Sequence, residues 1–183
     1  MKTKIIYGLI GHGKVARHIS HYFKLLSIPH KIWSRQENVE DPDVYLKNCD
    51  VILVLISDSA IENFISSWPH LTTKKVVHFS GVLTTPLAFG IHPLMTFSEK
   101  LYDLYTYERM AFVCEQSTAL KFSDVFPNLR NKHFEIKASD KAYYHSLCVM
   151  SGNFTTILWQ KLLSELEGRF DIPVEVGQHY LQR

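Results

Sequence analysis

The chain has 183 residues, of which 46% are hydrophobic and 21% charged, and this composition excludes a disordered tail or a fibre. Its 20 Lys and Arg against 18 Asp and Glu give a formal charge of +2, too mild a basic excess for a dedicated nucleic-acid binder. No apolar run approaches the ~20 residues of a membrane helix, and the N-terminal segment lacks the cleavage site of a signal peptide. We therefore expect a globular protein of little more than one domain.

The three cysteines, Cys49, Cys114 and Cys148, form neither a CxxC pair nor a metal-ligand spacing. Free and mostly buried thiols are typical of a reducing compartment, so we expect a cytoplasmic protein. Four histidines could converge in the fold, but they form no HExxH or HxH motif and no pair four residues apart: His12, His78, His92 and His145. The sequence therefore predicts no metal site.

Short apolar runs alternate with segments of helical spacing over the first three quarters of the chain. Residues 51–56 (VILVLI) are apolar at every position, which is typical of a strand covered on both faces in a parallel sheet. A capping box at Ser59–Glu62 predicts a helix directly after that strand, with Asp58 competing with Ser59 for the cap. The alternation predicts a doubly wound, mostly parallel α/β sheet over residues 1–138. The predicted strands are 4–10, 30–34, 51–56, 75–80, 89–92, 110–115 and 133–137, and the first helix is 14–26.

The pattern changes near Ser139, which with Asp140 is a candidate helix cap. From there to about Leu166 the sequence has no Pro and one Gly, a run of about 28 residues against a mean helix of ~11–12. We expect a long helix that leaves the sheet domain, then a loop at 168–173 and a further short helical stretch. The remainder after the long helix, residues 167–183, is too short to close a second core alone. We expect residues 139–183 to be a truncated α-helical segment that begins a C-terminal helical domain, or a segment that completes its core in a homodimer.

Residues 11–16 read G-x-G-x-x-A between the first predicted strand and the first predicted helix. In this pattern Gly11 allows a tight turn, Gly13 lets a pyrophosphate approach the backbone, and the helix N-terminus offers free N–H groups to an anion. The strand before it and the helix after it give the motif its specificity. We predict a nucleotide site in a Rossmann-type fold, against the alternative of a glycine-rich turn without a ligand. Its first candidate residues are Gly11, His12, Gly13, Lys14 and Val15.

The end of the second predicted strand indicates which nucleotide is bound. An NAD site would have an acid about 20 residues after the glycine loop, to accept a hydrogen bond from the ribose 2′-hydroxyl. This chain has Ser34 and Arg35 there instead, and a guanidinium beside a hydroxyl suits a 2′-phosphate. We therefore favour NADP over NAD, although Arg35 could be a solvated surface residue and a loop could return Glu37 to the site. Ser57, after the third strand, is the last cofactor-binding candidate.

Six stretches between residues 8 and 154 carry a resemblance to a known family: GLIGHGKVARHI, WSR, CDVILVLISDSAI, VVHFSG, HPLMTF and KAYYHSLCVMSGNF. The chain resembles the Rossmann-like NADP-dependent oxidoreductases of uncharacterised substrate that are related to pyrroline-5-carboxylate reductase and the deazaflavin-dependent NADP reductases. The resemblance implies an all-α domain after the sheet, with the long helix leading into it, and a cleft faced by His92–Pro93. The chain ends at Arg183, where that domain would be starting, so we expect the domain to be incomplete.

Four residues are candidates for the chemistry, because the cofactor itself would carry the hydride and histidine is a natural proton donor near neutral pH. His145, on the long helix, is the first candidate donor; on a regular α-helix Gly152 falls about 20° from it and Asn153 about 80°. Ser80, His92 and Asn153 would orient the substrate, since ligands bind beyond the carboxyl ends of the strands. Each candidate has a structural alternative. His145 could be a core histidine on a helix that another helix crosses at Gly152. Ser80 could belong to a plain strand-to-loop turn, and His92 could cap a loop.

The sequence predicts a reductase or dehydrogenase that transfers a hydride between NADP and a small carbonyl or imine substrate. The second hypothesis is an NADP-binding sensor or assembly module without catalysis. Lys141, one turn before His145, is a candidate for binding an anionic substrate, and a solvated lysine is the alternative. The expected partners are a small-molecule substrate and a second copy of the chain, with neither nucleic acid nor membrane.

Overall fold

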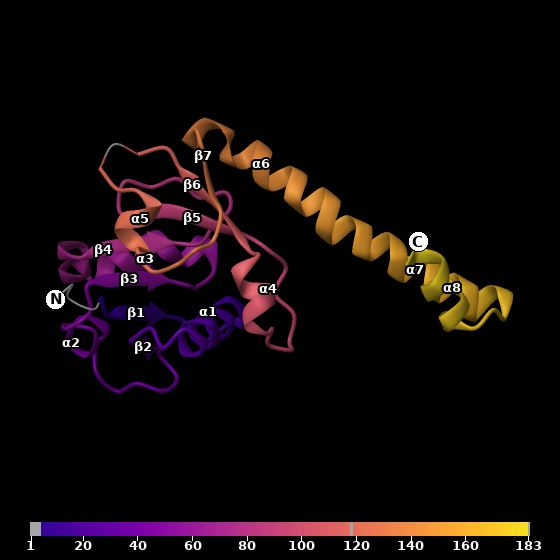
Figure 1. Cartoon of the computed structure of the whole chain (residues 1–183), viewed down its shortest axis with the longest axis horizontal. Helices are drawn as coiled ribbons and strands as arrows, with labels where there is room; N and C mark the ends of the chain where they lie inside the picture. Colours follow the sequence, from indigo (N-terminus) through magenta and orange to yellow (C-terminus); the bar gives the residue numbers. More distant parts are fainter. Residues whose placement is uncertain (1–4, 118, 183) are drawn as a thin grey trace. The chain divides into compact units, whose positions relative to one another are not determined.

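The structure, a computed structural model, describes residues 5–117 and 119–182. It divides into two compact units, residues 1–141 and residues 142–183, and each is described by itself. Figure 1 shows the strands of the first unit among their helices and the helical second unit that follows in the chain. The first unit ends close to the boundary that the sequence predicts after residue 138.

Seven strands of the first unit form one sheet in the order β2-β1-β3-β4-β5-β6-β7. Neighbouring strands pair in parallel except β5 and β6, which are antiparallel. The chain passes from β1 to β2 on one side and then to β3 on the other side of β1, so the winding reverses there. This is the Rossmann-type, mostly parallel α/β sheet that the alternation predicted. The strands are β1 (Tyr7–Ile10), β2 (His30–Trp33), β3 (Val51–Val54), β4 (Lys75–His78), β5 (Phe89–Leu94), β6 (Ala111–Glu115) and β7 (His133–Ile136).

The helices occupy the stretches between and after these strands. The α-helices are α1 (Lys14–Leu25), α2 (Pro42–Tyr45), α3 (Asp58–Ser67), α4 (Leu104–Glu108), α5 (Phe122–Val125), α6 (Lys141–Cys148), α7 (Thr155–Phe170) and α8 (Val174–Leu181). Two 3₁₀ turns, η1 (Pro69–Thr73) and η2 (Ala138–Asp140), and a π-helical segment, η3 (Val149–Phe154), complete the described helical structure.

Apolar side chains alternate between the two faces of the sheet, because successive residues of a strand point to opposite sides. Leu9 and Leu53 lie in a core cluster that includes residues of α1, α4 and α5. Ile10 and Ile52 lie in a second cluster that includes residues of α3 and Leu46, after α2. The fully apolar third strand is therefore buried on both faces, as its sequence predicted.

The expected cap of α3 at Ser59 is wrong, whereas the long helix starts next to the residues that the sequence predicts. The helix α3 begins at Asp58, with Ser57 at the N-cap position and no side-chain hydrogen bond there, so the box at Ser59–Glu62 is not used. The helix α6 begins at Lys141, directly after Asp140, the last residue of η2, and the Ser139 hydroxyl donates to the Asp140 carboxylate. At Asp58 and at Asp140 alike, a hydroxyl donates to the short carboxylate side chain.

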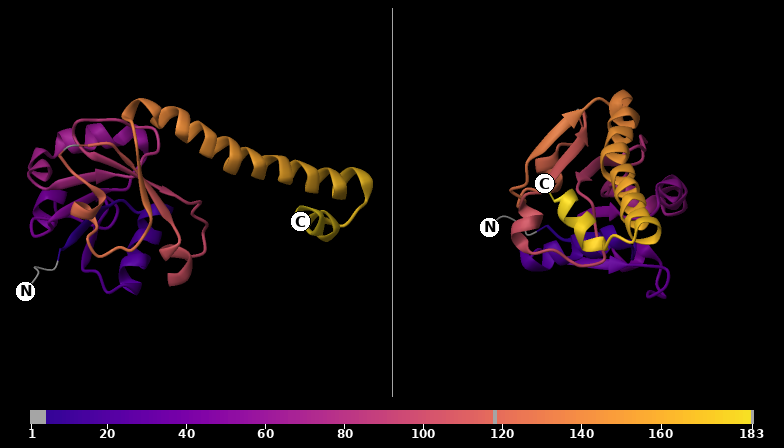
Figure 2. Two further views of the ribbon diagram at one scale, coloured as in Figure 1. Left: turned by 45° about the horizontal axis from the view of Figure 1, so that its top comes forward. Right: turned by 90° about the vertical axis from the view of Figure 1, so that its right-hand side faces the viewer.

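The second unit is a long helical run that turns back into a short helix. The elements α6, η3 and α7 follow one another from Lys141 to Phe170, which extends the run beyond the predicted end at Leu166. Asp171 then takes a left-handed conformation (φ 53°), a common way to end a helix. The glycine of α8, Gly177, is buried against side chains of α7, which lies beside it in Figure 2. No residue of α7 is buried.

Candidate functional site

A cavity of about 930 Å³ opens at the carboxyl ends of β1, β2 and β3. Ligands of doubly wound sheets bind at such a place, where the winding of the strands reverses. Its walls are the glycine loop, the turn after β2 and one face of α3. Six of the eight predicted cofactor-binding residues line it: Gly11, His12, Gly13, Ser34, Arg35 and Ser57.

The glycine loop is shaped by two glycines with different roles. Gly11 has a φ of +132°, and a Cβ there would overlap the carbonyl oxygen of Leu55 in the chain after β3. No other residue type fits that position without strain. Gly13 is the N-cap residue of α1, and a Cβ there would meet no other atom within 4 Å. The space in front of Gly13 is therefore open, and the N–H groups of the first turn of α1 face it without intrahelical acceptors.

The turn after β2 buries Ser34 at the edge of the cavity. The Ser34 backbone N–H donates to Asn38 Oδ1 (2.9 Å), and the N–H groups of Glu37 and Asn38 donate to the Ser34 carbonyl oxygen (3.2 and 3.0 Å). Ser34 is 5% exposed, and its hydroxyl has no hydrogen-bond partner within the described chain. A buried hydroxyl left unpaired costs free energy, so it is suited to bind a polar ligand group.

Arg35 supplies a positive charge beside this hydroxyl. It is exposed and lines the cavity, and within residues 5–117 and 119–182 no carboxylate forms an ion pair with it. A guanidinium with all its donors available can bind phosphate oxygens in a bidentate way. Ser34 and Arg35 together therefore offer a hydroxyl and a cation to an anion at the end of β2.

Three aromatic side chains also line the cavity, those of Trp33, Phe64 and Trp68. The ring centroids of Trp33 and Phe64 lie 5.7 Å apart. The Trp33 indole N–H donates to the Glu40 carbonyl oxygen (2.8 Å), which fixes the ring. The sequence analysis missed Phe64 and Trp68, although Ala60, Asn63, Phe64 and Ser67 recur at helical spacing on one face of α3.

The remaining two cofactor candidates of the sequence analysis do not line the cavity. The Lys14 ammonium pairs with Glu99 (2.8 Å), and Arg17 approaches the same carboxylate (3.4 Å). Hydrogen bonding and charge from Lys14 hold the pKa of Glu99 below its ordinary value. Val15 packs against the core cluster under α1. Lys14 is thus engaged with an acid of the loop after β5.

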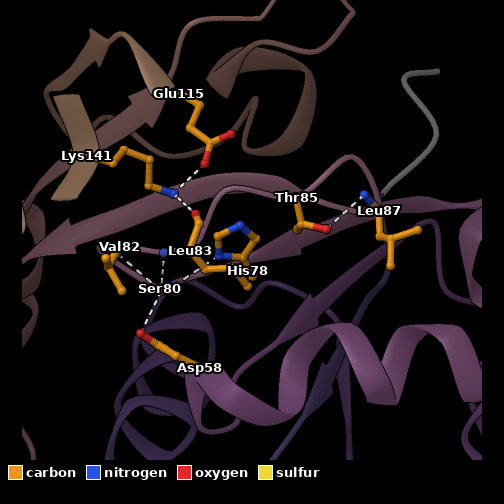
Figure 3. Close-up of polar contacts among 9 residues, drawn as sticks. All are labelled: Asp58, His78, Ser80, Val82, Leu83, Thr85, Leu87, Glu115 and Lys141. Carbon is orange, nitrogen blue, oxygen red and sulfur yellow. Dashed lines mark hydrogen bonds and ion pairs between the residues drawn. The ribbon is translucent and has the colours of Figure 1, made fainter. Parts of the chain in front are cut away.

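Ser80, after β4, is tied into a turn by all the hydrogen bonds that a hydroxyl can make. It donates to the Asp58 carboxylate (2.7 Å) and accepts from the backbone N–H groups of Val82 (3.2 Å) and Leu83 (2.9 Å), as Figure 3 shows. Asp58 therefore orders the turn of Ser80 rather than capping α3 by a side-chain hydrogen bond. A role for Ser80 in orienting a substrate stays a prediction, and its hydroxyl would have to leave this turn.

Two further titratable groups lie buried beside this turn. His78 is 0% exposed and its Nδ1 accepts the backbone N–H of Ser80 (3.2 Å); burial, with the charge of Lys141, lowers its pKa to about 3. The Lys141 ammonium is buried and donates to the Glu115 carboxylate and to the Leu83 carbonyl oxygen (Figure 3). The expectation of a solvated lysine is therefore wrong, and a role of Lys141 in binding an anionic substrate stays a prediction that would require this ion pair to break.

The other candidates for the chemistry lie outside the lining of the cavity. His92 is half-buried within β5, in register with Val113 of β6. His145 is half-buried on α6, and Asn153 is exposed on η3, both in the second unit. Their catalytic roles stay predictions.

The segment between His145 and Asn153 differs from the regular helix that the sequence analysis assumed. The π-helical segment η3 includes Gly152 and Asn153 and holds more residues per turn, so the expected angles of about 20° and 80° do not apply. Within the part of the chain that the structure describes, a Cβ at Gly152 would meet no other atom within 4 Å. Such π segments are frequent at functional sites.

Comparison with solved structures finds the same fold in NADP-linked enzymes. A candidate NADP oxidoreductase from Bacteroides fragilis superimposes with a TM-score of 0.70 at 16% identity, over 98% of this chain and 78% of that one. Pyrroline carboxylate reductase from Plasmodium falciparum with NADP bound gives 0.70 at 12% identity, over 97% and 75%. A reductive aminase from Aspergillus terreus in complex with NADPH and ethyl-5-oxohexanoate gives 0.65 at 15% identity, over 98% and 72%.

At these identities the likeness confirms the expected resemblance at the level of the fold. No family model matches the chain, and no curated protein matches its sequence. Within the described residues, no helix combines the length and apolar character needed to cross a membrane. The same residues contain no group of three His, Cys, Asp or Glu side chains placed to hold a metal ion.

Proposed function

We propose that the cavity at the ends of β1, β2 and β3 binds NADP, with the 2′-phosphate at Ser34 and Arg35. The observation that carries the proposal is that, among the described residues, the buried Ser34 hydroxyl has no hydrogen-bond partner and the neighbouring Arg35 forms no ion pair with a carboxylate. An NAD site would instead need an acid at this strand end. The similar P. falciparum and A. terreus structures hold NADP and NADPH, respectively.

The other walls of the cavity fit the rest of this cofactor. The space before Gly13 is open and adjoins the N-terminus of α1, whose N–H groups would bind a pyrophosphate there. The absence of a side chain at Gly13 leaves that space free. The aromatic rings of Trp33 and Phe64 line the cavity and would pack against the aromatic base. Ser57, exposed at the N-terminus of α3, would supply a hydroxyl between these two subsites.

The reaction that we propose is reduction or oxidation of a small carbonyl or imine substrate. NADP supplies the hydride chemistry when bound, and the chain must bind the substrate, orient it and hold one proton. His145 is the proposed proton donor, and His92, Asn153 and the turn of Ser80 are proposed to orient the substrate. The similar proteins named as a pyrroline carboxylate reductase and a reductive aminase favour an imine.

We also propose a cytoplasmic homodimer formed through the second unit. That unit has 42 residues, and within the described chain no residue of its helix α7 is fully buried. Burial of this apolar surface by a second copy would stabilise the helix. Light scattering would test the dimer by its mass. The exposed apolar residues of the unit include Leu147, Met150, Phe154, Ile157, Leu158 and Trp159.

The test of the cofactor proposal uses two fragments that differ by one phosphate, 2′,5′-ADP and 5′-AMP. Arg35→Gln should weaken 2′,5′-ADP binding about tenfold, the effect of one charge-assisted hydrogen bond, and leave 5′-AMP binding unchanged. The matched control is Arg109→Gln, since Arg109 contacts Tyr105 and does not line the cavity. Equal losses for both fragments, or a loss in the control, would contradict the assignment of Arg35.

Catalysis is tested separately, by following NADPH absorbance in the presence of small cyclic imines and carbonyl compounds. Consumption of NADPH that depends on the protein and the substrate supports an oxidoreductase. Tight NADPH binding without consumption for any of these substrates would favour the second hypothesis, a sensor or assembly module.

A further inference from the structure

The turn after β2 places an acid beside the glycine loop. The two hydrogen bonds to the Ser34 carbonyl oxygen fold residues 34–38 back on themselves. The Glu37 carboxylate then lies 3.3 Å from the Nδ1 atom of His12, with both side chains about half exposed. Gln36 and Asn38, the neighbours of Glu37, both line the cavity, whereas Glu37 itself does not. Glu37 is therefore at the rim of the cavity, turned toward the glycine loop.

An acid at this place would change which cofactor binds. A carboxylate at the end of β2 accepts hydrogen bonds from the ribose hydroxyls of NAD, and it repels the 2′-phosphate of NADP. The side chain of Glu37 has enough rotatable bonds to leave the rim, and its backbone is anchored between two cavity-lining residues. What keeps the carboxylate at the rim then matters for cofactor preference.

The contact with His12 is the only ion pair of Glu37 within residues 5–117 and 119–182. An imidazole with hydrogen on Nδ1 can donate to the carboxylate when neutral, and it attracts the carboxylate further when protonated. His12 also lines the cavity, so the same side chain bounds the nucleotide site and holds the acid.

Two acids, Glu40 and Asp41, line the cavity, and among the described residues neither forms an ion pair with His12. Glu40 is tied through its backbone carbonyl to the Trp33 indole, and Asp41 precedes α2 at its N-cap. They lie on the side of the turn that leads to α2, three and four residues beyond Glu37 in the chain. Substitutions of Glu40 or Asp41 therefore serve as matched controls, because each removes a carboxylate that lines the cavity and leaves the contact between His12 and Glu37 in place.

We propose that His12 determines the preference of this site for NADP over NAD by holding the Glu37 carboxylate at the rim of the cavity. The inference rests on the NADP site proposed above. His12 is in this account a positioning residue, since its effect on the 2′-phosphate passes through Glu37. Loss of the imidazole should release an acid that favours NADH and disfavours NADPH.

The experiment measures dissociation constants of NADPH and NADH for the full chain and its variants by calorimetry. His12→Ala should lower the ratio of the NADH dissociation constant to the NADPH dissociation constant about fivefold. This is the size of the effect expected when one negative charge comes close to a phosphate. His12→Asn should retain the ratio of the unsubstituted chain, because the Asn amide nitrogen can take the place of Nδ1. In the Glu37→Gln background, His12→Ala should leave the ratio unchanged, whereas in the Glu40→Gln background the fivefold fall should persist.

Each outcome decides for or against the role of His12. An unchanged ratio in His12→Ala, or the same fall with Glu37 already neutralised, would overturn the proposal. An unsubstituted chain that binds neither nucleotide would instead overturn the NADP site itself. The two failures are thus distinguishable, because the second appears before any variant is made.

Discussion

The buried ion pair of Lys141 and Glu115 gives the sharpest prediction about stability. The two side chains are 4% and 11% exposed, and the ammonium also donates to the Leu83 carbonyl oxygen. Lys141→Met keeps the length of the side chain but leaves the Glu115 carboxylate buried without a counter-charge. Breaking a buried pair in this way typically costs ~3–5 kcal/mol, a large part of the ~5–15 kcal/mol that stabilises a domain.

Urea unfolding followed by circular dichroism measures this loss as a change in the free energy of unfolding. The control is Lys161→Met, which removes an exposed ion pair with Glu165 four residues away and should cost less than ~1 kcal/mol. The double variant Lys141→Met, Glu115→Leu should recover most of the loss, because it leaves no buried charge behind. A cost for Lys141→Met no larger than that of Lys161→Met would refute the reasoning that this pair is shielded from water.

Three further predictions concern the first unit. The depressed pKa of His78 keeps its imidazole neutral in the folded chain, whereas the imidazole of the unfolded chain binds a proton below about pH 6.5. The contribution of His78 to the free energy of unfolding is therefore fully present above about pH 6.5 and is lost as the pH falls toward about 3. His78→Asn, whose amide can still accept the Ser80 N–H, should reduce the loss of stability between pH 7 and pH 5 by ~2 kcal/mol in urea unfolding; an unchanged pH dependence would contradict the buried neutral state. Gly11→Ala should destabilise the fold by ~3 kcal/mol, because φ is +132° and a methyl group overlaps Leu55. Gly13→Ala should change stability by less than ~1 kcal/mol yet weaken NADPH binding in a titration, since its methyl group points into open space; unweakened binding would place the pyrophosphate elsewhere.

Local pattern was enough to predict the sheet and the glycine loop. The apolar run 51–56 indicated a strand buried on both faces, and its residues do divide between two cores. The spacing of Gly11 and Gly13 after a strand predicted a tight turn before a helix, and the φ of Gly11 is the reason that the turn needs glycine. These features depend on neighbours in the chain, so a single sequence carries them.

The features that the sequence did not predict depend on partners distant in the chain. Lys141 is separated from Leu83 by 58 residues and from Glu115 by 26, so its burial has no local signal. Asp58 was expected to cap its own helix, but the Ser80 hydroxyl, 22 residues away, donates to it. The π-helical segment η3 likewise has no distinct spacing in the sequence, since its residues continue a helical pattern on both sides.

The candidate cofactor site contains features that local sequence predicts and features that depend on the path of the folded chain. Ser34 and Arg35 were found from their distance to the glycine loop, and they line the same cavity as that loop. The possibility that Glu37 returns to the site was left open by the sequence, because it depends on the path of a turn. The structure shows that Glu37 comes back to His12, and this contact carries the proposal on cofactor preference.

The most direct test of the central claim is a paired calorimetric titration of the unsubstituted chain with NADPH and NADH at one pH and salt concentration. The account predicts that NADPH binds at least about tenfold more tightly, since the 2′-phosphate gains charge-assisted hydrogen bonds from Arg35 and Ser34. Equal affinities, a preference for NADH, or no binding of either nucleotide would contradict it.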